Sequence, residues 1–261
     1  MLDSVDYRIP SMRHRVSPEE WQARVDLAAC YRLVDLYHMS DLIANHVSVR
    51  VPGEDAFLIN AYGLLYEEIT ASSLMKVDYD GNILLKPEFP DQDYGVNRAG
   101  FVIHSAVHKA RHDLACVAHT HTVAGIAVSC LKVGLLPLTQ HSMRFYGRIA
   151  YHDWEGPATN LDERERLVAD LGPHDAMVLR NHGLLAAGRS VAEAFDNIYF
   201  LERACQAQIA ALAGGAELVF PPEEVRSRTA AQFRRDAEAR AARAWKAALR
   251  LVEHDRIDYR S

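Results

Sequence analysis

The sequence is poor in cysteine, has no excess of basic residues and contains no long apolar run. Its four cysteines, Cys30, Cys116, Cys130 and Cys205, form no C-x-x-C pair and have apolar neighbours. We therefore expect reduced core thiols in a cytoplasmic protein instead of a disulfide framework. No stretch approaches the roughly 18 consecutive apolar residues of a transmembrane helix, and the N-terminus lacks the apolar region of a signal peptide. The net charge of −6 argues against nucleic-acid binding, which needs a clustered basic surface.

Histidine, by contrast, is abundant, with 13 among the 261 residues. Imidazole is the commonest protein ligand for metals and the side chain whose ordinary pKa lies nearest neutrality. The 49% hydrophobic and 25% charged shares are typical of a globular protein that is long enough to bury a large core. The positions of the histidines are therefore the first guide to what this globular chain does.

The apolar pattern alternates between helical and strand periods along the chain. Ser17-Pro18-Glu19-Glu20 starts a helix that runs to about His38, because Ser17 can cap it and Pro18 suits its first turn. The other predicted elements are hairpins over 46–60 and 73–85, strands over 114–123, 176–183 and 184–188, and helices over 100–111, 124–131, 161–171 (capped by Asn160), 190–214 and 222–252. Residues 134–158 are predicted to be irregular.

This pattern predicts one domain over residues 17–220, with a mainly antiparallel sheet covered by helices. Residues 1–16 are polar and aperiodic and are expected to form an N-terminal arm. Residues 221–261 are expected to form a helical extension that packs on the domain or on a neighbouring subunit.

The sharpest local motif is His119-Thr120-His121. Residues i and i+2 of a strand point to the same face, so both imidazoles can present a nitrogen to one metal ion. Catalytic tetrahedral sites commonly use three protein ligands, and His182, at the end of a predicted strand, is the candidate for the third. The alternative is structural: histidines bonded to carbonyls on a half-buried strand, and an Asn181-His182-Gly183 turn in which glycine supplies a positive φ.

The remaining histidines divide into groups. His104 and His108 share one face of a predicted helix, and His104 is either an outer-sphere residue that orients a metal ligand or a core histidine. His46, His141 and His152 occupy strand-edge or loop positions and stay open. The histidines that we expect at the surface are His14, His38, His112, His174 and His254.

Three ordered blocks resemble the class II aldolase/adducin family. FVIHSAVHKARHDLACVAHTHTVAGIAVS (101–129) is similar to the family's helix, turn and H-x-H strand, and VLRNHGLLAAGRSVAEAF (178–195) to its Asn-His-Gly segment with the following helix. Between them, GLLPLTQHSMRFYGRIAYHDWEGP (134–157) resembles the adducin-like bacterial branch more than the sugar-phosphate aldolases. The resemblance extends over about residues 20–215.

The resemblance implies a three-layer α/β/α domain with a mostly antiparallel central sheet. It also implies a divalent-metal site, usually zinc and with manganese or iron as alternatives, whose ligands fall on His119, His121 and His182. Members of the family usually form homotetramers with sites near subunit interfaces and act on small molecules, so a homo-oligomer with a small-molecule substrate is expected, without a nucleic-acid or membrane partner.

Two departures from the family pattern bear on the reaction. Where the sugar-phosphate aldolases carry a Ser-Ser-Glu run that ends in the acid/base glutamate, this chain has Arg98-Ala99-Gly100, and their early Gly-Asn pair is Asn45-His46 here. Gly100 cannot carry a proton, and the hydroxyls that would bind a substrate phosphate are missing. If the missing carboxylate is the only obstacle, Gly100→Glu should raise aldol cleavage of small hydroxy-ketones.

The substrate-binding candidates are Arg98, Asn45, His46 and Gly63. Arg98 suggests a planar anion, because a guanidinium grips a carboxylate with two hydrogen bonds; the alternative is a surface or interface ion pair. A bound divalent ion would stabilise the enolate of a retro-aldol cleavage and of a decarboxylation alike. Decarboxylation needs no base for a hydroxyl proton, so the loss of the glutamate favours it.

The proton carrier that replaces the glutamate is predicted among His141, Tyr146 and His152. His141 ranks first because it follows Gln140 and has no evident structural role.

Three functions remain open: a metal-dependent lyase (decarboxylase or aldolase) acting on a non-phosphorylated carboxylate or carbonyl compound, a non-enzymatic adducin-like binding module, and a non-haem iron enzyme on the same three histidines.

Overall fold

The computed structural model describes residues 9–90, 92–156, 162–255 and 257–261. Within these ranges, eight strands form one sheet in the order β4-β3-β2-β1-β5-β8-β7-β6. Neighbouring strands are antiparallel, except that β6 and β7 are parallel. The strands are β1 (His46–Arg50), β2 (Ala56–Ile59), β3 (Met75–Asp78), β4 (Ile83–Leu85), β5 (Cys116–Thr120), β6 (Ile149–His152), β7 (Ala176–Leu179) and β8 (Gly183–Gly188).

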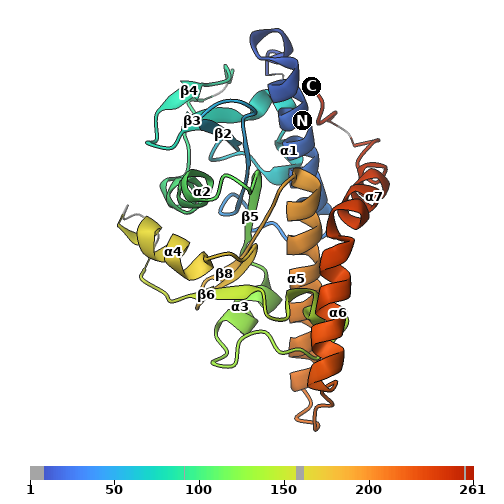
Figure 1. The fold of residues 1–261 in the computed structure, drawn as a ribbon. Helices are drawn as coiled ribbons and strands as arrows, with labels where there is room; N and C mark the ends of the chain where they lie inside the picture. The colour runs from blue at the N-terminus through green and yellow to red at the C-terminus, as the bar shows by residue number, and fades with distance from the viewer. Residues whose placement is uncertain (1–8, 91, 157–161, 256) are drawn as a thin grey trace, which may run out of the picture.

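Helices cover both faces of this sheet (Figure 1). The α-helices are α1 (Pro18–Leu36), α2 (Arg98–Ala110), α3 (Val123–Ser129), α4 (Glu163–Leu171), α5 (Val191–Leu212), α6 (Glu223–Arg235) and α7 (Ala237–Leu249). Helices α1 and α5 pack on one face, and α2 and α4 on the other. The three-layer α/β/α fold with a mostly antiparallel sheet is therefore confirmed.

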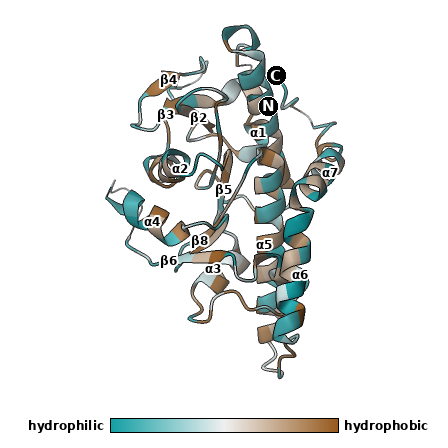
Figure 2. Ribbon diagram, in the orientation of Figure 1, coloured by the Kyte–Doolittle hydropathy of each residue, from teal (hydrophilic) through white to brown (hydrophobic). Residues whose placement is uncertain are grey.

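Side-chain alternation along the strands divides the core into two layers. Ala118 of β5 and Ala186 of β8 belong to the cluster that includes Leu27 of α1 and Ile198 of α5. Their neighbours Val117, Leu185 and Met177 belong to a second cluster with Ile103 of α2 and Leu167 of α4. In Figure 2 the strands are mainly brown and the helices alternate between teal and brown, as expected for helices that bury one face.

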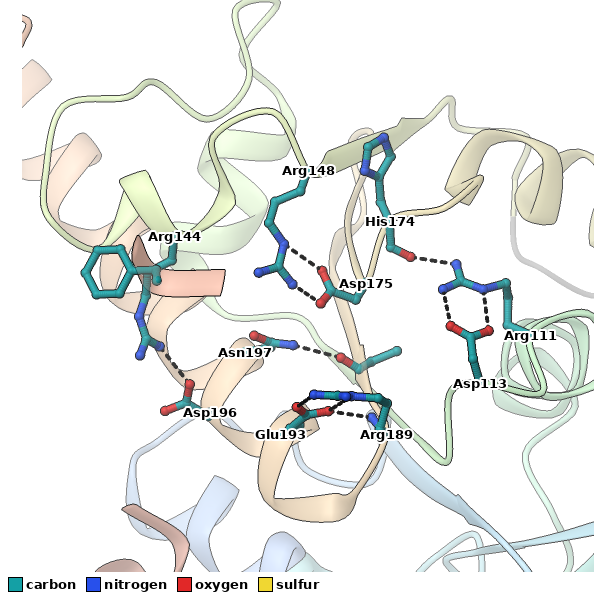
Figure 3. A network of polar contacts seen from close by, with 12 residues as sticks. Arg111, Asp113, Arg144, Arg148, His174, Asp175, Arg189, Glu193, Asp196 and Asn197 are labelled. Atoms are coloured by element: carbon teal, nitrogen blue, oxygen red, sulfur yellow. Dashed lines mark hydrogen bonds and ion pairs between the residues drawn. The ribbon is translucent and has the colours of Figure 1, made fainter. Parts of the chain in front are cut away.

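Polar contacts join the elements at one end of the sheet (Figure 3). Arg148, just before β6, forms an ion pair with Asp175, just before β7. Arg144 reaches Asp196 of α5 at 2.9 Å, and both side chains are buried. These contacts tie the segment before β6 to the neighbouring strand and to α5, because a buried charge is stable only when it is paired.

Several expectations about the elements need correction. The helix predicted over 222–252 is two helices that break at Asp236, and α7 packs against α5 with the Trp245 ring 5.8 Å from that of Phe195. The region 134–158 contains β6 and a short 3-10 helix over Ser142–Phe145. Cys130 is exposed and not in the core, because α3 ends before it. The predicted cap Asn160 lies outside the described residues.

Candidate metal centre

Three histidines meet where the central strand β5 ends and its neighbour β8 begins. His119 lies in β5, His121 follows the end of that strand, and His182 lies in the turn between β7 and β8. Strand β8 pairs with β5, with Thr120 opposite Leu184, so the turn that precedes β8 comes to the end of β5. Ligand atoms of the three histidines all lie within 4.8 Å of one another.

The turn at His182 depends on two unusual backbone positions. Asn181 has a positive φ of 55°, a conformation that asparagine tolerates better than most residues. Gly183 has no positive φ, contrary to the sequence-based expectation. Its role is close approach, because a Cβ there would collide with the carbonyl oxygen of Thr120. A larger residue would separate β8 from β5 and move His182 away from His121.

The ring nitrogens converge. The Nε2 atoms of His119 and His121 are 2.8 Å apart, and those of His121 and His182 are 3.0 Å apart. His119 Nδ1 lies 2.9 Å from the carbonyl oxygen of Leu184, and His121 Nδ1 lies 3.1 Å from Asp41 Oδ2. A carbonyl and a carboxylate only accept, so both Nδ1 atoms carry the proton in these bonds.

With the proton on Nδ1, the Nε2 atoms of neutral His119 and His121 each carry a lone pair, and these two lone pairs face each other. Such an arrangement is repulsive unless a cation lies between the two nitrogens. Metal-binding histidines typically donate their other ring N–H to a carbonyl or a carboxylate, which fixes the tautomer in this way. The donor set thus fits a divalent ion that accepts imidazole ligands, such as zinc.

Burial keeps His119 and His182 neutral, as metal ligation requires. Burial lowers the pKa of His119 well below its ordinary value, and the neighbouring His182 and His121 lower it further. Burial and His121 lower the pKa of His182 to about 4. Near neutral pH, protons therefore compete weakly for these two histidines.

A fourth histidine, His46, lies opposite His119 in the β1–β5 register. Its imidazole packs on Gly100 of α2: a Cβ at Gly100 would lie 2.6–2.7 Å from three ring atoms. His46 is 3% exposed, and neither ring nitrogen has a hydrogen-bond partner among the described residues. Burial and the nearby His121 lower its pKa to about 3. The neighbouring Asn45 is likewise buried with its amide unpaired within the described ranges.

His104 has a partner other than the three-histidine cluster. Ser48 Oγ lies 2.6 Å from His104 Nδ1 and 2.7 Å from His108 Nε2, with all three side chains fully buried. A hydroxyl has one proton, so it donates to one imidazole and accepts from the other. Within the described chain, no hydrogen bond joins His104 to a predicted ligand, and its outer-sphere role stays a prediction.

A small cavity of about 10 Å³ lies beside His182, and His152 also lines it. His152 is 4% exposed. Its Nδ1 lies 2.7 Å from Asp170 Oδ2, and its Nε2 lies 3.5 Å from Glu163 Oε1. Trp154 lines the same cavity, with its ring centroid 5.2 Å from that of His182.

The other predicted site residues lie in α2, in the connection after β2 and in the segment before β6. Arg98 is exposed at the first residue of α2, and Gly63, with φ of 121°, packs against the Tyr94 ring. The His141 ring is 5.1 Å from that of Phe200, and Tyr146 Oη donates to Glu223 of α6. No bond or ring contact in the described part of the chain joins His141 or Tyr146 to the three histidines.

A family model described as "Class II Aldolase and Adducin N-terminal domain" matches residues 25–209. The chain belongs to the class II aldolase/adducin family. Among its relatives in this family, a Pseudomonas aeruginosa protein provisionally named as an aldolase class 2 protein is 49% identical over 250 residues, which is 94% of this chain and 95% of the relative. Alpha-adducin of Rattus norvegicus is 46% identical over 192 residues, which is 73% of this chain and 26% of the adducin.

Solved structures of the class II aldolase/adducin family agree with the fold. The aldolase II superfamily protein from Pseudomonas syringae superposes with a TM-score of 0.87 at 54% identity, covering 96% of this chain and 100% of that one. L-fuculose 1-phosphate aldolase from Glaciozyma antarctica gives a TM-score of 0.79 at 26% identity, covering 91% of this chain and 92% of the aldolase chain. These matches confirm the family that the sequence blocks predicted. Among the described residues, no helix has both the length and the apolar character needed to cross a membrane.

Sequence reasoning missed one contact of the histidine cluster and gave no sign that His152 lies beside His182. Asp41, which binds His121, lies in the connection between α1 and β1 and carries no motif. His152 was a candidate, but only the parallel pairing of β6 with β7 places it at the cavity beside His182. Its position just before Asp153-Trp154-Glu155 gave no signal of that pairing.

Proposed function

We propose that this chain is a divalent-metal-dependent carbon–carbon lyase that acts on a non-phosphorylated carboxylate or carbonyl compound, as a decarboxylase or an aldolase. The observation that carries the proposal is the convergence of three imidazole Nε2 atoms at 2.8 and 3.0 Å. The names of its relatives, which include a class 2 aldolase and L-fuculose 1-phosphate aldolase, support a lyase.

His119, His121 and His182 would hold the ion, with zinc proposed first because three neutral imidazoles suit it. When bound, the ion would polarise a carbonyl or carboxylate oxygen of the substrate and stabilise negative charge that develops as a carbon–carbon bond breaks. The proposed assembly is a homotetramer, as the family resemblance implies.

The surroundings of Gly100 support a reaction other than sugar-phosphate cleavage. The family's acid/base glutamate has no counterpart there, and the His46 ring occupies the space next to the Gly100 Cα. The missing hydroxyls at Arg98 and Ala99 remove the expected phosphate contacts. Arg98, exposed at the start of α2, is proposed to bind a carboxylate instead, together with Asn45, His46 and Gly63.

His152 is the proton carrier that the surroundings favour over His141 and Tyr146. Asp170 accepts its Nδ1–H, which leaves Nε2 for proton exchange on the side of the cavity shared with His182. As carbon dioxide leaves, the electron pair of the broken bond stays on the substrate carbon. The protonated Nε2 then supplies a proton to that carbon, and water restores it.

Metal analysis of the full chain purified without chelator tests the first part of this proposal. We expect one equivalent of zinc or manganese in the wild type and its loss in His119→Ala. Carbon dioxide release from β-keto and aromatic acids, compared with cleavage of hydroxy-ketones and of L-fuculose 1-phosphate, then separates decarboxylase from aldolase. Absence of bound metal together with absence of turnover would favour the adducin-like binding module; iron with oxygen uptake would favour a non-haem iron enzyme.

The proton carrier is tested by comparing His152→Gln with His141→Gln. We expect His152→Gln to lower kcat by about 10²–10⁴-fold, the usual contribution of a general acid, with metal content unchanged. His141→Gln is the matched control and should stay within about threefold, since the His141 ring packs at a tilt against Phe200 and does not line the cavity beside His182. The reverse ranking would restore His141 as the proton carrier.

A further inference from the structure

We propose that Asp41 is a positioning residue for the histidine cluster and that metal binding, through Asp41, fixes the backbone of residues 38–45. The proposal rests on the metal site of the proposed function but not on any particular reaction. It concerns the connection between α1 and β1, which carries no recognised motif and delivers Asn45 and His46 to the cluster.

The contact itself is specific. Asp41 Oδ2 lies 3.1 Å from His121 Nδ1, and the carboxylate is the hydrogen-bond partner of that nitrogen. By accepting the Nδ1 proton, Asp41 leaves the Nε2 lone pair of His121 pointing at the Nε2 atoms of His119 and His182. A carboxylate in this position also makes the imidazole a stronger ligand. His119 has the equivalent partner in the Leu184 carbonyl, which is backbone, so Asp41 is the partner that a mutation can remove.

The backbone around Asp41 is held in an uncommon conformation. Leu42 has a positive φ of 47°, which non-glycine residues adopt at a cost. The positive φ of His38, 55°, belongs instead to the cap that ends α1, where the His38 and Met39 amides donate to the Asp35 and Val34 carbonyls. Leu42 is 77% exposed, so burial of its side chain does not hold it there. Strained backbone of this kind persists only where surrounding contacts determine it.

Beyond the two hydrogen bonds that cap α1, few contacts in the described structure restrain this segment. Ser40 Oγ donates to Asp35 at 2.7 Å, the Ala44 amide donates to the Asp41 carbonyl at 2.8 Å, and Met39 is buried. The Asp41 carboxylate adds the contact to the histidine cluster. Because that contact needs the Nδ1–H tautomer of His121, which metal ligation at Nε2 imposes, binding the ion and holding the segment favour each other. Such a coupling is reciprocal by thermodynamic linkage.

The consequence falls on the two residues that end the segment. Asn45 and His46 are buried beside the cluster, and their polar side-chain atoms have no hydrogen-bond partner among the described residues. Unsatisfied buried polar groups are rare in folded proteins, so these two side chains are suited to meet a substrate. Metal binding would thereby set their position before the substrate arrives.

The experiment measures metal affinity and hydrogen exchange in the full chain, with zinc alone as the probe. Zinc Kd is measured by competition with a chromophoric chelator for the wild type, Asp41→Ala, Asp41→Asn and Ser40→Ala. Exchange of peptides that cover residues 38–46 is measured with and without zinc. Ser40→Ala is the matched control, because it loosens the same segment but does not touch His121.

We expect Asp41→Ala to weaken zinc binding by about 10- to 100-fold, as for other outer-sphere partners. Asp41→Asn should weaken zinc binding by at least threefold but by less than Asp41→Ala does, because its amide oxygen still accepts the Nδ1 proton. Ser40→Ala should stay within about twofold. Zinc should slow exchange over 38–46 in the wild type and in Ser40→Ala, but not in Asp41→Ala.

Two results would overturn the proposal: wild-type zinc affinity in the Asp41 variants, or zinc protection of 38–46 that persists in Asp41→Ala. If Asp41→Ala does not fold, Asp41→Asn decides by the same affinity criterion. If the wild type binds no zinc, manganese or iron, the metal site of the proposed function is wrong. If the wild type and the Asp41 variants bind zinc equally well, only the role of Asp41 is wrong.

Discussion

At the scale of single residues, His46 and Gly100 form a complementary pair. The imidazole ring fills the space in which a Cβ at position 100 would stand. A carboxylate therefore cannot be restored at Gly100 while His46 keeps its position. This contact changes the simple expectation that Gly100→Glu by itself would bring back aldol cleavage.

We predict that Gly100→Glu is destabilised by about 1–3 kcal/mol, as is usual for overpacking in a core, and gains no aldol activity. The double variant His46→Asn/Gly100→Glu replaces the larger ring and should recover stability and cleave small hydroxy-ketones faster than the wild type. Urea unfolding and a coupled carbonyl assay measure the two effects. A single variant that is as stable as the wild type would mean that the His46 ring moves freely.

At the scale of elements, the cluster exists because one turn meets the end of one strand. Residues 119 and 121 share a short segment, so their proximity follows from strand geometry. His182 is brought in by the β5–β8 pairing, which continues to Thr120 and Leu184. Gly183 allows β5 and β8 to pair as far as Thr120 and Leu184, because any side chain at position 183 would collide with the Thr120 carbonyl.

Gly183→Ala should therefore damage the metal site through the backbone. We expect zinc affinity to fall more than tenfold and the free energy of unfolding to fall by about 1–3 kcal/mol, the usual cost of a steric clash in a packed site. Chelator competition and urea unfolding measure both. Gly214→Ala is the control, since nothing lies near its Cβ and its φ is not positive; equal zinc affinity in the two variants would contradict the role assigned to Gly183.

The elements themselves were largely predictable. Capping residues and the apolar period located α1 and α5, whose N-caps Ser17 and Ser190 accept from Glu20 and Glu193 as expected. The break between α6 and α7 was not predictable, because the Ala- and Arg-rich sequence favours a continuous helix on local propensity alone. Tertiary packing decides it, since the break turns α7 against α5.

At the scale of the whole molecule, the buried histidines make stability depend on pH. Burial is the main cause that lowers the pKa of His46 and of His108 to about 3, against about 6.5 in an unfolded chain. Their stabilising contribution is complete above pH 6.5. It is lost as the pH falls toward 3, because the unfolded chain then binds protons that the folded chain does not.

For chelator-treated protein, we predict that these two histidines together lower the free energy of unfolding by roughly 2–3 kcal/mol between pH 7.5 and 5.5. Urea unfolding at both pH values measures the total loss, which is larger because the pKa values of His104, His119 and His182 are also lowered by burial. His108→Gln should make it smaller by about 1 kcal/mol, whereas His112→Gln, at an exposed position, should not change it. Stability that is the same at both pH values would show that these histidines are protonated in the folded state.

The sequence by itself determined the family, the order of the elements and the identity of the three candidate ligands. Motif spacing and side-chain periodicity are local properties, and they survive in the folded chain. Only the tertiary structure decided that Asp41 reaches His121, that His46 stands in place of a side chain at Gly100, and that His152 lines a cavity beside His182. Each of these contacts joins residues that are far apart in the sequence. Strand pairing and helix packing create such contacts, and no local sequence pattern predicts them.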